Sequence, residues 1–262
     1  MSAILLEREI VHYEVLGRGR PVIFMHGWVG SWRYWVPAMQ AVSASYRAYA
    51  IDLWGFGDTA KSKKRYSLLQ QVALINSFME QMGVARVALI GHGLGAAVAL
   101  LLAQSYPKVI DRVMAVACPM DETRLSARLR SGSSVELADW LLNHSAITEP
   151  ARVDAPKADL PAIQNSLTEL ASTGLRKLLS NLPVSCLLVH GQNDPAVELP
   201  RLEDQVSMPE QTHTIIFEQS GHFPMLDEGT KFNRLLIDFL ALPSGTSPRD
   251  LQLKEEWVRR VR

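Results

Sequence analysis

Residues 89–97 read Leu-Ile-Gly-His-Gly-Leu-Gly-Ala-Ala, a β-rich apolar run that passes through a turn of small residues into an apolar helix. At least three strand-like runs precede this turn, and strand-like and helical runs alternate around it. Such alternation predicts a largely parallel sheet covered by helices on both faces. With 262 residues, 47% of them hydrophobic, the chain is long enough to form one α/β domain with a large core.

Hydrophobic periodicity places the individual elements. We expect a hairpin near 4–16, strands near 21–26, 46–52, 86–91, 112–118, 184–190 and 212–218, and helices over 66–82 and 94–105. Both helices show apolar faces at helical spacing, and the second is apolar almost all round, as suits a helix against a sheet.

Two polar residues follow late strands of this pattern. Asp194 comes just after the apolar run 184–189, and His222 follows the run 212–218 on a Gly-His-Phe-Pro loop. Taken singly, Asp194 could simply end its strand before a proline, and a lone histidine is more often structural than catalytic. The carboxyl ends of parallel strands share one sheet edge, however, so both residues are expected there. An aspartate that orients an imidazole and a histidine that acts as a base are two members of a catalytic triad.

The ordered segments resemble the α/β-hydrolase fold superfamily, in its esterase, epoxide hydrolase, haloperoxidase and meta-cleavage-product hydrolase-like branch. The turn at 91–95 resembles the Gly-x-Ser-x-Gly nucleophile elbow, and the order nucleophile, acid, histidine is the family's own. The resemblance runs from residue 8 to 242. It implies a mostly parallel eight-stranded sheet flanked by helices, with a small helical lid. It also implies that Gly93 stands at the nucleophile position without a nucleophile.

The same resemblance suggests the rest of a site. His26-Gly27-Trp28 follows a strand, as does the family segment that contributes one oxyanion-hole N–H, so the backbone N–H groups of Trp28 and Leu94 are the expected donors. The residues expected to line a ligand pocket are His26, Gly27, Trp54, His92 and Phe223. Trp54 stands where an arginine is frequent in the related branches. Such aromatic walls favour a small apolar or aromatic ligand.

His92 and His26 each have a structural and a chemical interpretation. His92 precedes the elbow position, where a histidine is usually a packed structural residue in this family. A substitute nucleophile at His92 is the weaker alternative, because adjacent turn residues point in different directions. His26 is better interpreted as a brace of its turn than as an acid–base catalyst.

The expected domain organisation has three parts. Residues 1–118 and 183–242 form the α/β-hydrolase core, and residues 119–182, where the alternation stops, form a helical lid. The alternative for 119–182 is a merely structural helical excursion. Residues 243–262 form a linker, Pro-Ser-Gly-Thr-Ser-Pro, followed by an amphipathic tail over 249–262. We expect this tail to dock on the body or to extend freely, and binding to a protein partner is the alternative.

Composition limits the other function classes. The formal net charge is zero, which gives no general attraction to nucleic acid or to an anionic membrane. A dinucleotide-binding loop is disfavoured, because Ala96 and Ala97 stand where the third glycine of that motif would be required.

The seven histidines are dispersed along the sequence, so we expect neither a metal nor another cofactor. Cys118 and Cys186 lie in apolar runs, as buried thiols do.

The beginning of the chain bears on location. Positions 7–9 are charged, so the first residues do not form the long apolar segment of a signal peptide, and they lack its cleavage site. We therefore expect a cytoplasmic protein.

Three functional hypotheses remain open. Removing the nucleophile of a serine hydrolase costs about 10⁶ in turnover, so the first is a pseudo-hydrolase that binds a small ligand or partner. The second is a serine hydrolase of carboxylic esters or carbon–carbon bonds whose nucleophile has been substituted, by inheritance or by design. The third is a lyase or cofactor-independent oxygenase in which His222 and Asp194 act without a serine.

Overall fold

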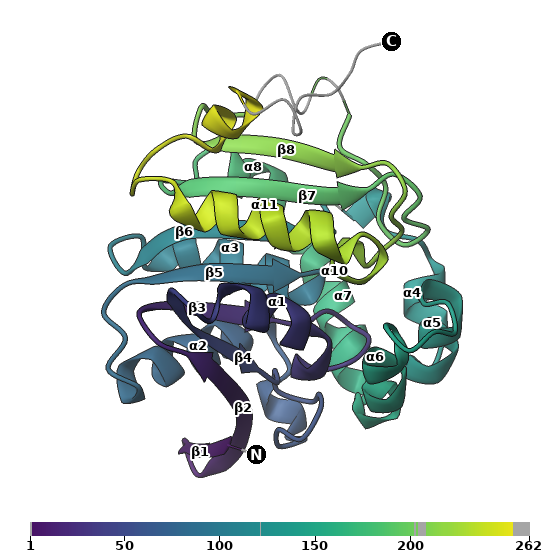
Figure 1. Ribbon diagram of the computed structural model, residues 1–262. Helices are drawn as coiled ribbons and strands as arrows, with labels where there is room; N and C mark the ends of the chain where they lie inside the picture. The colour runs from purple at the N-terminus through teal and green to yellow at the C-terminus, as the bar shows by residue number, and fades with distance from the viewer. Residues whose placement is uncertain (1, 121, 202, 204–207, 254–262) are drawn as a thin grey trace.

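The computed structural model describes residues 2–120, 122–201, 203 and 208–253. Its centre is one eight-stranded sheet with the order β1-β2-β4-β3-β5-β6-β7-β8 (Figure 1). The strands are β1 (Ser2–Leu6), β2 (Glu9–Gly17), β3 (Arg20–Met25), β4 (Tyr46–Ile51), β5 (Val87–His92), β6 (Ile110–Val116), β7 (Ser185–Gly191) and β8 (Thr212–Phe217). The predicted fold class, an eight-stranded mostly parallel sheet with flanking helices, is confirmed.

Only the first two strands are antiparallel to their neighbours. The β1–β2 hairpin pairs with β4, and every later pairing, from β3–β4 to β7–β8, is parallel. β5 and β7 are buried along their whole length. This burial on both faces explains why they are continuous apolar runs rather than alternating patterns.

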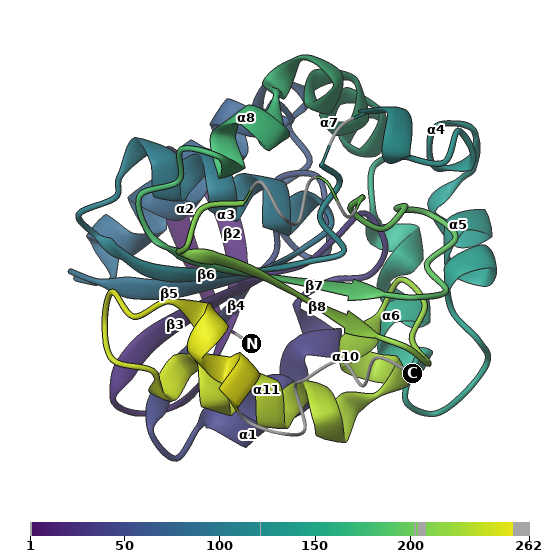
Figure 2. The same cartoon turned by 90° about the horizontal axis from the view of Figure 1, so that it is seen from above.

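Helices cover both faces of the sheet (Figure 2). α1 (Val36–Val42) and α11 (Gly229–Ala241) lie on one face, and α2 (Leu68–Gln81), α3 (Leu94–Ser105) and α8 (Leu175–Leu179) lie on the other. α3 packs against β5 and β6 and is buried on nearly all sides, which accounts for its almost wholly apolar sequence.

Residues 119–182, called the inserted segment below, contain mainly short helices. These are η3 (Glu122–Arg124), α4 (Arg128–Ser131), α5 (Ser134–Leu141), α6 (Glu149–Asp154), η4 (Ala155–Lys157) and α7 (Leu160–Thr173), followed by α8. α4, α5 and α6 lie beyond the carboxyl ends of the parallel strands (Figure 1). The inserted segment therefore stands at the sheet edge where the polar residues were expected.

The described part of the carboxyl-terminal region returns to the sheet. After α11, η5 (Pro248–Leu253) packs beside β7 and β8. Ser185 Oγ donates to the Thr246 carbonyl at 2.7 Å, and Leu251 is 1% exposed. Residues 243–251, predicted as a linker and the start of the tail, are thus held against the body. The remainder of the predicted amphipathic tail, 254–262, lies outside the described residues.

Three short elements complete the description: η1 (Trp32–Trp35), η2 (Lys63–Arg65) and α10 (Pro224–Asp227). None of the helices in the described ranges combines the length and the apolar composition that spanning a bilayer requires.

Candidate active site

The glycine-rich turn joins β5 to α3. β5 ends at His92, α3 begins at Leu94, and Gly93 between them has φ 50° and ψ −108°. This backbone conformation is uncommon for residues with a side chain and easy for glycine. A Cβ on Gly95 would overlap the carbonyl of Met25, so the third glycine of the motif is required by close packing of α3 against β3.

Asp194 and His222 meet at the carboxyl edge of the sheet. His222 Nδ1 donates to Asp194 Oδ2 at 2.8 Å, and both side chains are almost fully buried. Their loops are joined by a hydrogen bond of 2.9 Å from the Asn193 N–H to the Ser220 carbonyl. β7 and β8, which are neighbours in the sheet, therefore deliver an acid and an imidazole in contact.

The other carboxylate oxygen of Asp194 is also occupied. Asp194 Oδ1 accepts hydrogen bonds from the backbone N–H groups of Ala196 and Val197 at 2.8 and 3.1 Å. Burial raises the pKa of Asp194, but the opposing effects of His222 and these N–H groups outweigh it and leave the pKa below its ordinary value. Asp194 is thus a carboxylate in a fixed orientation.

His92 and Tyr34 form a buried chain of hydrogen bonds. His92 Nε2 lies 2.9 Å from the His222 carbonyl, which can only accept, so Nε2 carries the proton. Burial lowers the pKa of His92 well below its ordinary value, so the ring is neutral and its Nδ1 accepts from the Tyr34 hydroxyl at 2.9 Å. The same hydroxyl accepts from the Gly27 N–H at 2.7 Å. This chain joins the 26–28 turn to the loop that carries His222.

The indole of Trp28 covers both Gly93 and His222. Its ring stacks beside the imidazole of His222, with centroids 6.5 Å apart and planes at 19°. A Cβ built on Gly93 would lie 3.0 Å from Trp28 Cζ3, a distance at which the indole would have to shift. Trp28 Nε1 donates to Ser166 Oγ of α7 at 3.0 Å. The inserted segment therefore holds the indole in front of the turn.

Phe223 belongs to the same aromatic cluster. Its ring centroid lies 4.7 Å from that of His92, 5.3 Å from that of His222 and 5.5 Å from that of Tyr34. Among the residues predicted to line the pocket, the structure thus gathers Phe223 and His92 around the His222 loop.

His26 and Trp54 have other surroundings. His26 Nδ1 donates to the Gly27 carbonyl and its Nε2 accepts from the Leu53 N–H, so the buried ring braces the turn. Trp54 lies under the Arg65 guanidinium, with Cζ 5.2 Å from the ring centroid. Within the described residues, Trp54 has no ring contact with the His222 cluster.

The two predicted oxyanion donors are available. Across the described residues, neither the Trp28 nor the Leu94 backbone N–H donates a hydrogen bond, whereas the Gly27 N–H is taken by Tyr34. Leu94 directly follows Gly93, and the Cα of Gly27, the residue before Trp28, lies 3.6 Å from the place of a Cβ on Gly93.

The inserted segment is fixed to the core by residues that the sequence did not indicate. Asp154, 1% exposed, accepts from Ser31 Oγ and from Arg33 Nε, the latter at 2.9 Å. Burial raises the pKa of Asp154, and the hydrogen bonds from Ser31, Arg33 and Lys157 more than offset this, so the pKa lies below its ordinary value. Ser166 and Asp154 stand in no recognisable motif, and only the folded structure reveals their partners.

One group of side chains has the composition of a cation site. Ligand atoms of His12, Asp52 and Asp58 all lie within 4.8 Å of one another. His12 Nδ1 and Asp52 Oδ2 are 3.0 Å apart in a hydrogen bond, and Asp58 pairs with Lys157 at 2.9 Å. These contacts already engage His12 Nδ1 and both carboxylates, whereas the buried Nε2 of His12 makes no hydrogen bond within the described residues and lies 3.5 Å from Glu14 Oε1.

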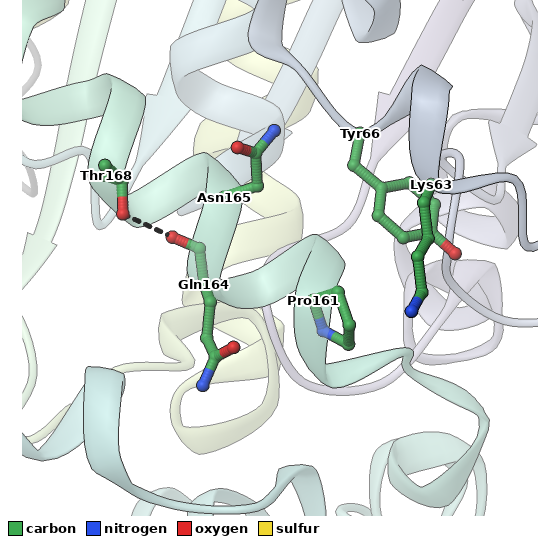
Figure 3. A pocket seen from close by; sticks show the side chains of 6 residues that line it. All are labelled: Lys63, Tyr66, Pro161, Gln164, Asn165 and Thr168. Carbon is green, nitrogen blue, oxygen red and sulfur yellow. Dashed lines mark hydrogen bonds between the residues drawn. The ribbon is translucent and has the colours of Figure 1, made fainter.

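A separate polar pocket lies between η2 and α7. It has a volume of about 410 Å³ and is lined by Lys63, Tyr66, Pro161, Gln164, Asn165 and Thr168 (Figure 3). Thr168 Oγ1 donates to the Gln164 carbonyl at 2.8 Å, within α7 itself. None of the residues predicted to form the ligand pocket lines this one.

A mostly parallel sheet with an aspartate–histidine pair at its carboxyl edge, close to a glycine turn that starts a buried helix, defines the α/β-hydrolase class of fold. The chain belongs to the alpha/beta hydrolase family, whose model matches residues 22–235.

Known members of the family show the range of its relatives. The 2-hydroxy-6-oxo-2,4-heptadienoate hydrolase of Pseudomonas putida is 28% identical and aligns with 86% of this chain and 91% of its own length. The pimeloyl-(acyl-carrier protein) methyl ester esterase of Vibrio campbellii is 22% identical over 88% of this chain and 98% of its own. The homologues of this chain thus include esterases and carbon–carbon bond hydrolases.

One solved structure of similar fold is that of a mutant enzyme with a bound ligand. A serine-to-glycine mutant of the N-acyl homoserine lactonase AidH, complexed with N-hexanoyl homoserine lactone, superimposes with a TM-score of 0.78 at 18% identity. The alignment covers 91% of this chain and 96% of that one.

Proposed function

We propose that this chain is a pseudo-hydrolase: an α/β-hydrolase-fold protein without acyl-transfer activity that binds a small apolar or aromatic ligand. The observation that carries the proposal is Gly93. It lies between β5 and α3 with a positive φ, in the place where the family resemblance puts a serine, and offers no atom that could form an acyl-enzyme. Covalent catalysis through this turn is therefore absent.

The surroundings support retention of a binding site. Asp194 and His222 remain paired, and the N–H groups of Trp28 and Leu94 are without acceptors within the described residues. These groups would orient a ligand carbonyl beside Gly93, with the inserted segment acting as a lid. The lactonase mutant gives an example of a related fold in which a glycine replaces a serine and a lactone is bound.

A second candidate function rests on the aspartate–histidine pair. His222 Nδ1 is directed to Asp194, so its Nε2 is the nitrogen left to act as a base. An imidazole oriented in this way can abstract a proton from a ligand or activate a water molecule without a serine. Two backbone N–H groups hold Asp194 in one orientation, and this favours a site with a general base over a site that only binds a ligand.

One matched set of proteins tests the proposal. The chain itself, Gly93→Ser and Gly93→Ala are incubated with a fluorophosphonate probe and with short p-nitrophenyl esters. We expect neither labelling nor turnover for the glycine and alanine forms, because they have no nucleophile at this turn. Labelling confined to Gly93→Ser, and lost again in Gly93→Ser/His222→Ala, would show that the remaining groups are assembled around position 93.

The alternatives give different patterns. Efficient ester turnover in Gly93→Ser identifies the chain as a serine hydrolase silenced by a single substitution. Labelling of the glycine form at any residue, with ester turnover, overturns the proposal. Activity of the glycine form on a substrate with an acidic proton, abolished by His222→Ala but not accompanied by labelling, establishes the second candidate.

A further inference from the structure

The space in front of Gly93 is filled by a side chain of the protein itself. Trp28 is 1% exposed, its ring lies nearly parallel to that of His222 with centroids 6.5 Å apart, and its Cζ3 lies 3.0 Å from the place where a Cβ of residue 93 would stand. An indole is planar and apolar on its faces, with one N–H donor at its edge. It therefore has the size and shape of a small aromatic ligand.

The hydrogen bonds around Ser166 define what this space accepts. Ser166 Oγ donates its proton to the Ile163 carbonyl at 2.8 Å and accepts the indole N–H at 3.0 Å. Its hydroxyl proton is thus committed within α7, and toward Trp28 it presents only a lone pair. A molecule that replaced the indole would satisfy Ser166 only if it carried a donor at the same edge.

We propose that the Trp28 side chain is an internal occupant of the ligand site. The molecule that takes its place when the indole swings away is a planar aromatic compound with one hydrogen-bond donor, stacked on His222 and bonded to Ser166. This inference deepens the proposed function, because it names the ligand class of the same site. It also couples ligand entry to α7, since the indole cannot leave without breaking its bond to the inserted segment.

Substitution of the occupant creates the test. Trp28→Ala leaves a cavity of about the size of the lost ring, and buried apolar cavities of this kind bind small aromatic molecules. Indole is the probe, and benzothiophene, which has the same shape without the N–H, is its matched control. Binding is measured by calorimetry, and folding is checked by circular dichroism. Trp28→Phe provides a less disruptive second variant with a smaller cavity.

The expected results follow from the contacts. Trp28→Ala binds indole more tightly than benzothiophene, by about fivefold for one neutral hydrogen bond. Adding Ser166→Ala removes this preference and leaves benzothiophene binding unchanged. The unaltered chain binds indole at least tenfold more weakly than Trp28→Ala, because the ligand must first displace the native ring, which lowers the fraction of competent protein.

Two results overturn the inference. One is a folded Trp28→Ala, or Trp28→Phe if the alanine form does not fold, that binds neither compound. The other is equal indole binding by Trp28→Ala and the unaltered chain, which would place indole at another site. Both results are independent of the labelling experiment. The chain can lack acyl-transfer activity even if indole fails to bind, and indole can bind to Trp28→Ala even if the probe labels the glycine form.

Discussion

The His92 ring donates a hydrogen bond of 2.9 Å to the backbone carbonyl of His222, so the residue before the glycine turn directly supports the loop of the candidate base. Tyr34 continues the chain from the opposite nitrogen of His92 to the Gly27 N–H. Three segments that are distant in sequence are thus held by two buried side chains.

Tyr34→Phe tests this chain of hydrogen bonds. The substitution keeps the ring but leaves the buried Gly27 N–H and His92 Nδ1 unpaired, which destabilises the fold by about 1–3 kcal/mol. We expect amide hydrogen exchange at Gly27 to accelerate roughly tenfold, corresponding to about 1.4 kcal/mol of lost protection. Tyr106→Phe, at a tyrosine that is 41% exposed, is the control. Equal exchange at Gly27 in both variants would contradict the assigned network.

The backbone of Gly93 leads to a prediction about stability. Gly93→Ala places a side chain at φ 50° and against Trp28, and positive φ alone costs about 1–3 kcal/mol. Two control variants separate the cost of the backbone conformation from the cost of the contact with Trp28. The free energy of unfolding of all three variants is measured by urea denaturation. Gly174→Ala has φ 64° and open space around the new Cβ, so it shows the backbone cost alone. Gly229→Ala, with open space and ordinary φ, should be neutral or stabilising.

The order of the three variants is the informative result. We expect Gly93→Ala to be the least stable, Gly174→Ala intermediate and Gly229→Ala the most stable. If Gly93→Ala matched Gly229→Ala, neither the strained conformation nor the Trp28 contact assigned to this turn could be correct.

Asp194 makes the stability depend on pH. Its folded pKa lies below the ordinary value of 3.8, so its ionised form stabilises the fold above that value, and this contribution disappears as the pH falls through the folded pKa. The asparagine of Asp194→Asn cannot titrate, and it leaves the buried donors around it poorly satisfied. We therefore expect the free energy of unfolding to fall by about 2–3 kcal/mol at pH 7. The difference in unfolding free energy between the unaltered chain and Asp194→Asn should shrink as the pH falls below 3.8. A constant difference down to pH 2 would argue against a lowered pKa of Asp194 in the folded protein.

The Asp154 contacts predict how firmly the inserted segment is held. Asp154→Asn removes the charge that binds Arg33 and Lys157 while keeping the size of the side chain. We expect faster cleavage by a nonspecific protease within residues 119–182 and little change in the core. Glu149→Gln, at an exposed position of the same helix, should leave the cleavage rate unaltered. Indistinguishable digestion of the two variants would mean that the Asp154 contacts do not anchor the segment.

The elements of the fold could be predicted because each is encoded locally. Buried parallel strands require continuous apolar runs, and β5, β6 and β7 lie within two residues of the expected ranges. Asp194 and His222 could be placed together because both follow strands of one sheet. The direction of the Trp28 indole could not be predicted, because nothing near it in the sequence shows where the ring points.

The contacts that could not be predicted from the sequence join residues far apart along the chain. Ser166 lies 138 residues from Trp28, and Asp154 lies 121 residues from Arg33. Such pairs depend on how the inserted segment settles on the core and on side-chain directions, and neither leaves a periodic or spaced pattern. The buried bonds of Tyr34 were hidden for the same reason within an aromatic run, Trp-Arg-Tyr-Trp.

The conformation of Gly93 also limits what this turn can accept. Any side chain at position 93 would have to adopt a positive φ and would lie 3.0 Å from the ring of Trp28. Glycine is therefore the residue of lowest energy here. The stability of the fold alone favours glycine, so only a gain in function could retain a larger residue at this position.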